Sequence, residues 1–142
     1  MNKNTDNIIS MISTIREKSN KMIVREMASH NIKGLVTSHG DILVALFEKQ
    51  ILTMKEIADR IKKDKSTITA LIDKLIKYGY VKKQSNPQDS RVALVVLTQK
   101  GRKLQTDFDE ISSKLLSTVY KGISDNEKKT VSAILNKIKN NF

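Results

Sequence analysis

The chain has 142 residues, of which 39% are hydrophobic, and this length suits one compact domain or a small domain with helical extensions. No run approaches the roughly 18 consecutive apolar residues that a membrane-spanning helix needs. The first twenty residues mix charges and amides among their apolar positions, so we expect no secretory signal. Cysteine is absent, which excludes disulfides, thiolate metal sites and thiol-based redox sensing by this chain. We therefore expect a cytoplasmic protein.

The charge balance is strongly basic, with 26 Lys and Arg against 15 Asp and Glu and a formal net charge of +11. The excess is concentrated, because residues 55–91 carry ten basic and five acidic side chains. A concentrated positive field attracts polyanions such as nucleic acids. A lysine-rich, solvated surface explains the same charge equally well, so charge alone leaves both interpretations open.

Apolar residues at helical spacing predict two helices at the start of the chain. The first has one apolar face made by Ile8, Ile12, Ile15, Met22 and Ile23. It ends before a break at 31–34, where Gly34 suits a C-terminal cap. The second runs from about Ser38 to Gln50. Its inward positions are Ile42, Ala45 and Leu46.

Two short helices joined by the polar run 62–65 follow, and they form a candidate helix-turn-helix. The stripe of the first is Met54, Ile57, Ala58 and Ile61. The second repeats apolar residues at Ile68, Leu71, Ile72, Leu75 and Ile76. Gly79 stops it, because glycine adopts the left-handed conformation without a Cβ clash. Any helical hairpin can show this pattern, so by itself it is weak evidence for DNA binding.

The only good strand candidates are residues 81–85 and 92–97. The turn between them is Asn86-Pro87-Gln88-Asp89-Ser90, which contains the single proline of the chain. A two-stranded ribbon directly after the second helix of a helix-turn-helix is the arrangement of a wing.

Two longer helices complete the predicted order. Thr98 is the expected N-cap of the first, whose stripe is Leu104, Phe108, Ile111, Leu115 and Val119. Gly122 closes that helix, and Ser124 with Glu127 forms a capping box for the last one. The last helix presents Val131, Ile134, Leu135, Ile138 and Phe142.

The second helix of a helix-turn-helix enters the major groove with its N-terminal residues against bases and phosphates. Here those residues are Lys65, Ser66, Thr67, Thr69 and Ala70, with Asp73 and Lys74 one turn on. Small hydroxyl side chains allow close approach and hydrogen bonds, and a helix N-terminus favours phosphate. Ser66 and Thr67 are also common helix caps, so a purely structural role stays open for each.

The wing carries Arg91, two residues after Asp89. An arginine on a protruding wing can enter the minor groove, where narrow A·T-rich segments concentrate negative potential. Asp89 can hold the guanidinium in one direction through charge-assisted hydrogen bonds. The alternative is a surface ion pair of about 0–1 kcal/mol. The order of helix, turn and strand favours the wing interpretation.

Residues 66–101, STITALIDKLIKYGYVKKQSNPQDSRVALVVLTQKG, resemble the recognition helix, the wing and the start of the following helix in the MarR family. The family pattern there is a Ser/Thr-rich helix start, Asp-x-Leu, Gly-hydrophobic-Val/Ile, Asp-x-Arg, Leu-Thr and Gly. The matching positions are Ser66, Thr67, Thr69, Asp73, Leu75, Gly79, Val81, Asp89, Arg91, Leu97, Thr98 and Gly101. The outer helices match in pattern only.

The resemblance implies a mainly α fold with a small β-hairpin, in a single domain spanning 1–142. A winged helix-turn-helix lobe at about 53–98 would join dimerisation helices at about 5–30 and 99–142. It also implies a homodimer that binds a palindromic operator in double-stranded DNA, usually as a repressor relieved by a small ligand, with no cofactor. The outer helices agree, since a small winged lobe could not fully cover their apolar stripes.

Two positions depart from the family pattern: Ala70 stands where many members have arginine, and Ser90 where a basic residue is frequent. Both departures remove expected DNA contacts, so the base preference of relatives cannot be copied. Candidate backbone contacts that compensate are Lys65, Lys74, Lys82 and Lys83.

Members often bind phenolic or other anionic effectors between the dimer helices and the winged lobe. By pattern, such a site would use His30, His39, Phe47 and the helix at 104–115. A capping or surface role explains His39 better. A zinc site of His30, His39 and a carboxylate lacks HxxxH-type spacing, so we predict no metal site.

Two other classes of function have less support. A general architectural or RNA-binding protein would use the same positive surface, but the chain has only three Phe and three Tyr and no aromatic-rich strand for base stacking. An enzyme would need a Gly-rich phosphate loop, a cysteine nucleophile or a Ser-His-Asp set in a supporting context, and we find none. A solvated charged face explains Asp107, Asp109 and Glu110 better.

Overall fold

Residues 4–142 are described by the structure, a computed structural model of the chain, and residues 1–3 of the predicted domain lie outside the described part. The elements are α1 (Ile8–Ser29), α2 (Thr37–Lys49), β1 (Ile51–Thr53), α3 (Met54–Ile61), α4 (Lys65–Lys77), β2 (Val81–Asn86), β3 (Asp89–Leu97), α5 (Gln99–Arg102), α6 (Leu104–Val119) and α7 (Asp125–Asn140). The predicted fold class, mainly helical with a small antiparallel sheet, is confirmed.

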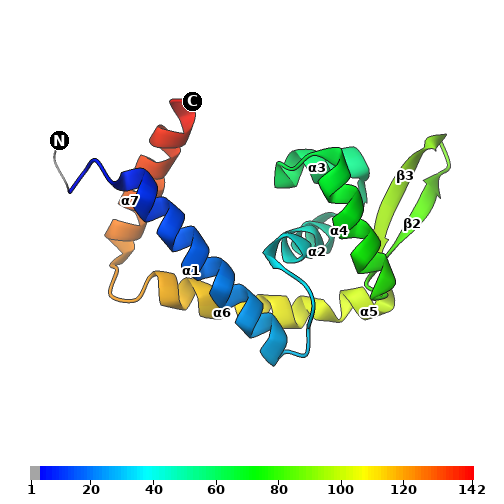
Figure 1. Ribbon diagram of the computed structural model, residues 1–142, viewed down its shortest axis with the longest axis horizontal. Helices are drawn as coiled ribbons and strands as arrows, with labels where there is room; N and C mark the ends of the chain where they lie inside the picture. Colours follow the sequence, from blue (N-terminus) through cyan, green and yellow to red (C-terminus); the bar gives the residue numbers. More distant parts are fainter. Residues whose placement is uncertain (1–3) are drawn as a thin grey trace.

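The elements form a lobe and a set of helical arms, which are α1, α7 and the far end of α6 (Figure 1). The lobe, on the right of the view, holds α2, α3, α4 and the sheet, and the strands β2 and β3 project from its outer edge. The helix α6 runs from the base of the lobe to the arms and packs against α1. The start of α1 and the end of α7 both lie at the far side from the lobe.

The hydrophobic core lies within the lobe, where α2 packs against α3, α4, α6 and the sheet. The largest fully buried side chains of these elements are Ile42, Leu43, Leu46, Ile57, Ile68, Ile72, Leu75, Val81 and Val95. Burying one such side chain contributes about 1.5–3 kcal/mol relative to leaving it exposed. The only buried residue of α1 is Met27, near its C-terminal end, so most of that helix lies outside the core.

The sheet has three antiparallel strands in the order β1-β3-β2, so the expectation of only two strands was wrong. The missed strand, β1, places Leu52 opposite Val95. Three residues are too few to show the alternation on which strand prediction depends. The strand forms because Gln50, with φ of 65°, ends α2 and turns the chain onto the free edge of β3.

The end of α1 also differs from the prediction. The helix is capped at His30 and followed by Asn31 with φ of 62°, so Gly34 is not its C-terminal cap. Glycine is favoured at position 34 for another reason. Its φ is 79°, a left-handed conformation that side chains disfavour, and a Cβ there would also lie 2.5 Å from the Tyr78 hydroxyl.

The junction between the wing and α5 is built on a close backbone approach. The Thr98 hydroxyl donates to the carbonyl of Gly79 at 2.5 Å and accepts from the N–H of Gly101 at 3.1 Å, so Thr98 is the N-cap that the sequence predicted. A Cβ on Gly101 would lie 2.0 Å from the carbonyl oxygen of Tyr80. The segment 97–101 therefore holds the end of β3 against the start of β2. The helix that follows is interrupted at Lys103, between α5 and α6.

The arms leave much apolar surface uncovered within one chain. The helix α7 has no buried residue, and its apolar side chains Val131, Ile134 and Leu135 are each more than 40% exposed. Further exposed apolar side chains lie on α1 and α6 and include Ile9, Met11, Ile15, Leu116 and Val119. Phe142, predicted to share the stripe of α7, is fully exposed. Over residues 4–142, no helix combines the length and hydrophobicity needed to cross a membrane.

Candidate nucleic-acid interface

The start of α4 is organised by a residue that the sequence prediction overlooked. Asp64 is the N-cap, and its Oδ1 accepts from the Thr67 N–H at 2.7 Å and from the Ser66 hydroxyl at 2.9 Å. These hydrogen bonds lower the pKa of the Asp64 carboxyl, because they stabilise its charged form. The interpretation of Ser66 and Thr67 as the caps was therefore wrong, and both side chains lie on the exposed surface of the first turn.

The exposed side of α4 carries the other predicted contacts. Ile68, Ile72 and Leu75 are buried, and Ala70 lies on the opposite, exposed side of the helix. The Thr69 hydroxyl donates to the carbonyl of Lys65 at 2.9 Å, so it is engaged within the helix. Lys74 lies beside Tyr78, with its Nζ 5.9 Å from the ring centroid.

The wing holds Arg91 in a defined local structure. Asn86 pairs with Asp89 while Ser85 pairs with Ala93, so residues 90–92 are extra residues on β3. A bulge of this kind changes the direction of a side chain at the edge of a sheet. Asp89 Oδ1 accepts from the Arg91 N–H at 3.0 Å and from Arg91 Nε at 3.2 Å. The Arg91 side chain is 89% exposed, so this pair adds little stability and mainly orients the guanidinium.

The structure brings Lys65 of α4 and Arg91 of the wing to one concave surface of about 710 Å³, which we call the wing groove. Its lining residues are Thr53, Met54, Lys55, Ala58, Lys65, Arg91, Val92 and Ala93, and none of them is acidic. The sequence analysis missed Lys55, which enters the groove because a capping box between Thr53 and Glu56 starts α3 there.

The remaining wing positions are less uniform. Lys82 and Ser90 are exposed and lie on β2 and β3. Lys83 was suggested as a phosphate contact. Its Nζ lies 3.9 Å from Asp73 Oδ1, and this ion pair joins the wing to α4. Tyr78 accepts from Lys100 at 2.7 Å through its carbonyl, which adds a second link between α4 and α5.

The three residues suggested for an effector site, His30, His39 and Phe47, each contact different partners. His39 is buried, and its Nδ1 accepts from the Val36 N–H at 2.9 Å, which is the capping role that the sequence favoured. Burial and the nearby charge of Lys74 lower the pKa of His39. Phe47 packs against Phe108, with ring centroids 5.8 Å apart.

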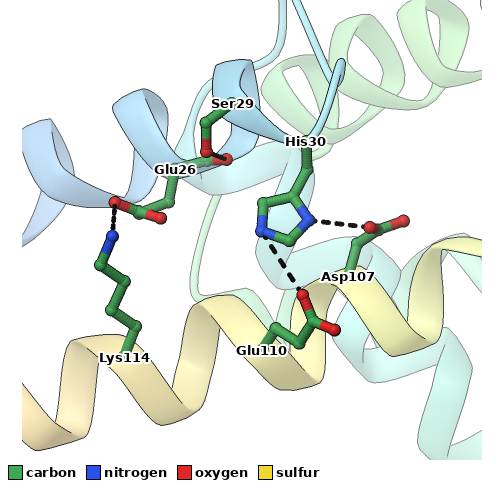
Figure 2. Close-up of polar contacts among 6 residues, drawn as sticks. All are labelled: Glu26, Ser29, His30, Asp107, Glu110 and Lys114. Carbon is green, nitrogen blue, oxygen red and sulfur yellow. Dashed lines mark hydrogen bonds and ion pairs between the residues drawn. The ribbon is translucent and has the colours of Figure 1, made fainter.

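His30 sits where α1 crosses α6 (Figure 2). Its Nδ1 lies 2.8 Å from Asp107 Oδ1 and its Nε2 lies 3.8 Å from Glu110 Oε2. Glu26 and Lys114, 2.7 Å apart, add a second polar link along the same crossing. His30 thus joins the arm to the base of the lobe. Within residues 4–142, no group of three His, Cys, Asp or Glu side chains is placed to hold a metal ion.

A second concave surface of about 820 Å³, which we call the arm pocket, lies between α1 and the start of α2. Its lining residues are Lys18, Asn20, Lys21, Met22, Val24, Arg25, Val36, Thr37, Ser38 and Thr118. Asn20 Oδ1 and Thr37 Oγ1 are buried and have no hydrogen-bond partner. No sequence pattern signals this pocket, because its residues come from separate elements and follow no motif.

Comparison with known proteins places this geometry in a family. A model of the MarR family matches residues 35–93, which include α2, the helix-turn-helix and most of the wing. Over these residues the chain is similar to the MarR family. Proteins of that family are transcriptional regulators, not enzymes.

Curated relatives agree with this assignment. The chain is 29% identical over 123 residues to the HTH-type transcriptional regulator SarZ of Staphylococcus aureus, over 86% of this chain and 80% of that protein. It is 26% identical over 100 residues to the uncharacterized HTH-type transcriptional regulator YybA of Bacillus subtilis, over 70% and 67% of the two chains.

Solved structures show that the likeness covers the arms as well as the lobe. A MarR transcriptional regulator from Methanosarcina mazei superposes with a TM-score of 0.84 at 25% identity, covering 96% of both chains. A mutant of Escherichia coli MarR, crystallised with operator DNA, superposes with a TM-score of 0.84 at 19% identity, covering 95% of both chains.

Replacing Asp64 with alanine tests the start of α4. The folded state lowers the pKa of Asp64, so its charged form stabilises the fold above the ordinary pKa of about 3.9. That contribution is lost as the pH falls through the folded-state pKa. We expect Asp64→Ala to lower the free energy of unfolding in urea at pH 7, and the gap to the parent protein to shrink toward pH 2. Asp64→Asn keeps a capping oxygen and should retain most of the stability. Equal stability of Asp64→Ala and the parent at pH 7 would contradict the capping role.

Proposed function

We propose that the chain is a sequence-specific regulator that binds double-stranded DNA as a homodimer. The wing groove is the observation that supports this most directly. Lys65 and Arg91, from two different elements, meet there without an acidic neighbour in the lining. Cationic side chains around a groove fit a phosphodiester backbone, and the adjoining first turn of α4 offers small side chains to base edges.

The dimer is proposed from the apolar surface of the arms. Exposed Val131, Ile134 and Leu135 on α7 recur at helical spacing and have no cover within the chain. Contiguous exposed apolar surface of this kind marks interaction sites. A second copy is the favoured partner, because the arms of both copies offer the same stripes to each other. Two-fold symmetry would place two copies of α4 about 34 Å apart, one turn of DNA, so the operator would be palindromic.

Arg91 should be the strongest single test of the DNA interface. Duplexes enriched from a random pool supply a palindrome, and its affinity is compared with that of a scrambled duplex at equal salt. We expect Arg91→Ala to weaken palindrome binding about tenfold or more, because each protomer loses a minor-groove contact. Lys129→Ala, which removes one charge from α7, should leave the affinity within about twofold. Fluorescence anisotropy measures both.

Unchanged affinity in Arg91→Ala would refute the wing contact. Equal affinity of the parent protein for palindrome and scrambled duplex would instead favour the alternative, a general architectural nucleic-acid-binding protein.

Substitution on α7 should separate dimerisation from folding. Leu135 is 43% exposed in one chain, so Leu135→Glu should leave the protomer folded but place a charge in the proposed interface. We expect a monomer by sedimentation at concentrations where the parent is a dimer, with lost palindrome binding. Ala133→Glu is the matched control, because Ala133 is exposed on the face of α7 opposite Leu135 and should remain a dimer. A dimeric Leu135→Glu protein would contradict the proposal.

We further propose that the regulator is a repressor released by a small anionic or aromatic effector, and that the effector occupies the arm pocket. Lys18, Lys21 and Arg25 supply positive charge there, and the N-terminus of α2, which also favours an anion, borders the pocket. The buried oxygens of Asn20 and Thr37 lack partners that a ligand would provide. The pocket joins the arm to α2, so an occupant would bias how the arms and the lobe are arranged.

Benzoate, an aromatic carboxylate, probes this pocket. We expect calorimetric binding of benzoate to the parent protein and weaker palindrome affinity in its presence. Arg25→Gln should abolish both effects while leaving ligand-free DNA affinity unchanged, because it removes only a charge of the pocket. Benzoate that binds Arg25→Gln as tightly as the parent would place the effector elsewhere.

A further inference from the structure

One row of exposed side chains runs along the middle of the outward side of α4. This outer row consists of Ser66, Ala70 and Asp73, all exposed, and it is followed one turn later by Lys77, the last residue of α4. At about 100° per residue, Ala70 lies about 200° around the helix from the buried Ile68, which places it directly opposite the core. When Lys65 and Arg91 hold a duplex at the wing groove, the outer row is the part of α4 that reaches deepest into the major groove.

From Ser66 to Asp73, the outer row contains no free hydrogen-bond donor. The Ser66 hydroxyl already donates to Asp64 Oδ1 at 2.9 Å, Ala70 has only a methyl group, and Asp73 offers only carboxylate acceptors. The neighbouring Thr69 hydroxyl donates to the carbonyl of Lys65, which leaves its methyl group for a ligand. Guanine presents two acceptors, O6 and N7, in the major groove and is read by donors such as arginine.

The other cations near this stretch lie at its margins. Lys65 lines the wing groove with Arg91, and Lys74 Nζ lies 5.9 Å from the Tyr78 ring centroid, toward the C-terminal end of α4. Lys83 lies beside Asp73 at 3.9 Å and partly offsets its repulsion of the DNA backbone. The middle of the recognition surface is therefore a methyl group flanked by acceptors.

We propose that Ala70 reads a thymine in each half-site, through contact between its methyl group and the C5 methyl of the base. This inference rests on the proposed DNA-binding function and names the base that the recognition helix selects. Thymine is the base that presents an apolar group in the major groove. Guanine at the same position is disfavoured, because its O6 and N7 would lose water without gaining a donor.

Uracil substitution isolates the methyl group. In a duplex enriched from a random pool, each thymine is replaced singly by deoxyuridine, which lacks only the C5 methyl. One thymine per half-site should lose about fourfold in affinity, the change that corresponds to about 0.8 kcal/mol for one buried methyl group. The other major-groove thymines should change less.

Two variants assign that effect to Ala70. In Ala70→Gly the sensitive thymine should tolerate uracil, while any other uracil effects persist. Ala133→Gly on α7 is the matched control, since it carries the same helix cost at an exposed position and should keep the full uracil effect. A new enrichment with Ala70→Arg should replace the thymine by guanine at the same position, because the guanidinium supplies the missing donors.

The possible outcomes distinguish a failure of this inference from a failure of the proposed DNA-binding function. A pool that yields no enriched duplex overturns the DNA-binding function and this inference with it. An enriched duplex whose thymines all tolerate uracil overturns the thymine reading alone. So does a uracil effect that survives in Ala70→Gly, or a guanine at the position facing Ala70 in the parent enrichment.

Discussion

The recognition helix and the wing can contact one DNA duplex because the backbone that joins them is tightly packed and hydrogen-bonded. Thr98 bonds the carbonyl of Gly79 and caps α5, and Gly101 lies so near the Tyr80 carbonyl that a Cβ would reach within 2.0 Å of its oxygen. The end of α4, the start of β2 and the end of β3 are thereby tied together. Lys65 and Arg91 meet in one groove only while this junction keeps its geometry.

The junction also sets how the lobe and the arms are connected. The helix α6 begins directly after α5, so its direction follows from the packing of Gly101. His30 then joins α6 to α1 through Asp107, and α1 leads to the arm pocket. In the proposed effector response, α6 is the element that links the arms to the base of the wing. The polar contacts at this crossing are partly exposed and contribute little stability individually, which suits a contact that rearranges.

Local patterns predicted most helices and the wing correctly, because those elements depend on spacing within a few residues. The stripe from Ile68 to Leu75, the N-cap Thr98 and the capping box of Ser124 and Glu127 all appear as expected. The failures have physical causes. The strand β1 forms only by pairing with β3, and Gly34 serves a left-handed turn in the loop beside Tyr78 rather than the cap of α1. Asp64 was missed as a cap because the following Ser and Thr offered the same chemistry.

The sequence by itself determined the class of the protein: the order of its elements, the basic segment and the wing motif from Asp89 to Gly101 all follow from local residue chemistry. It also determined that the recognition helix carries alanine at position 70. Only the tertiary structure decided which of these residues act together. The wing groove joins Lys55, Lys65 and Arg91 from three elements, and the arm pocket joins α1 to α2. Such sites arise from packing between segments distant in the chain, and no local pattern records how close two segments come.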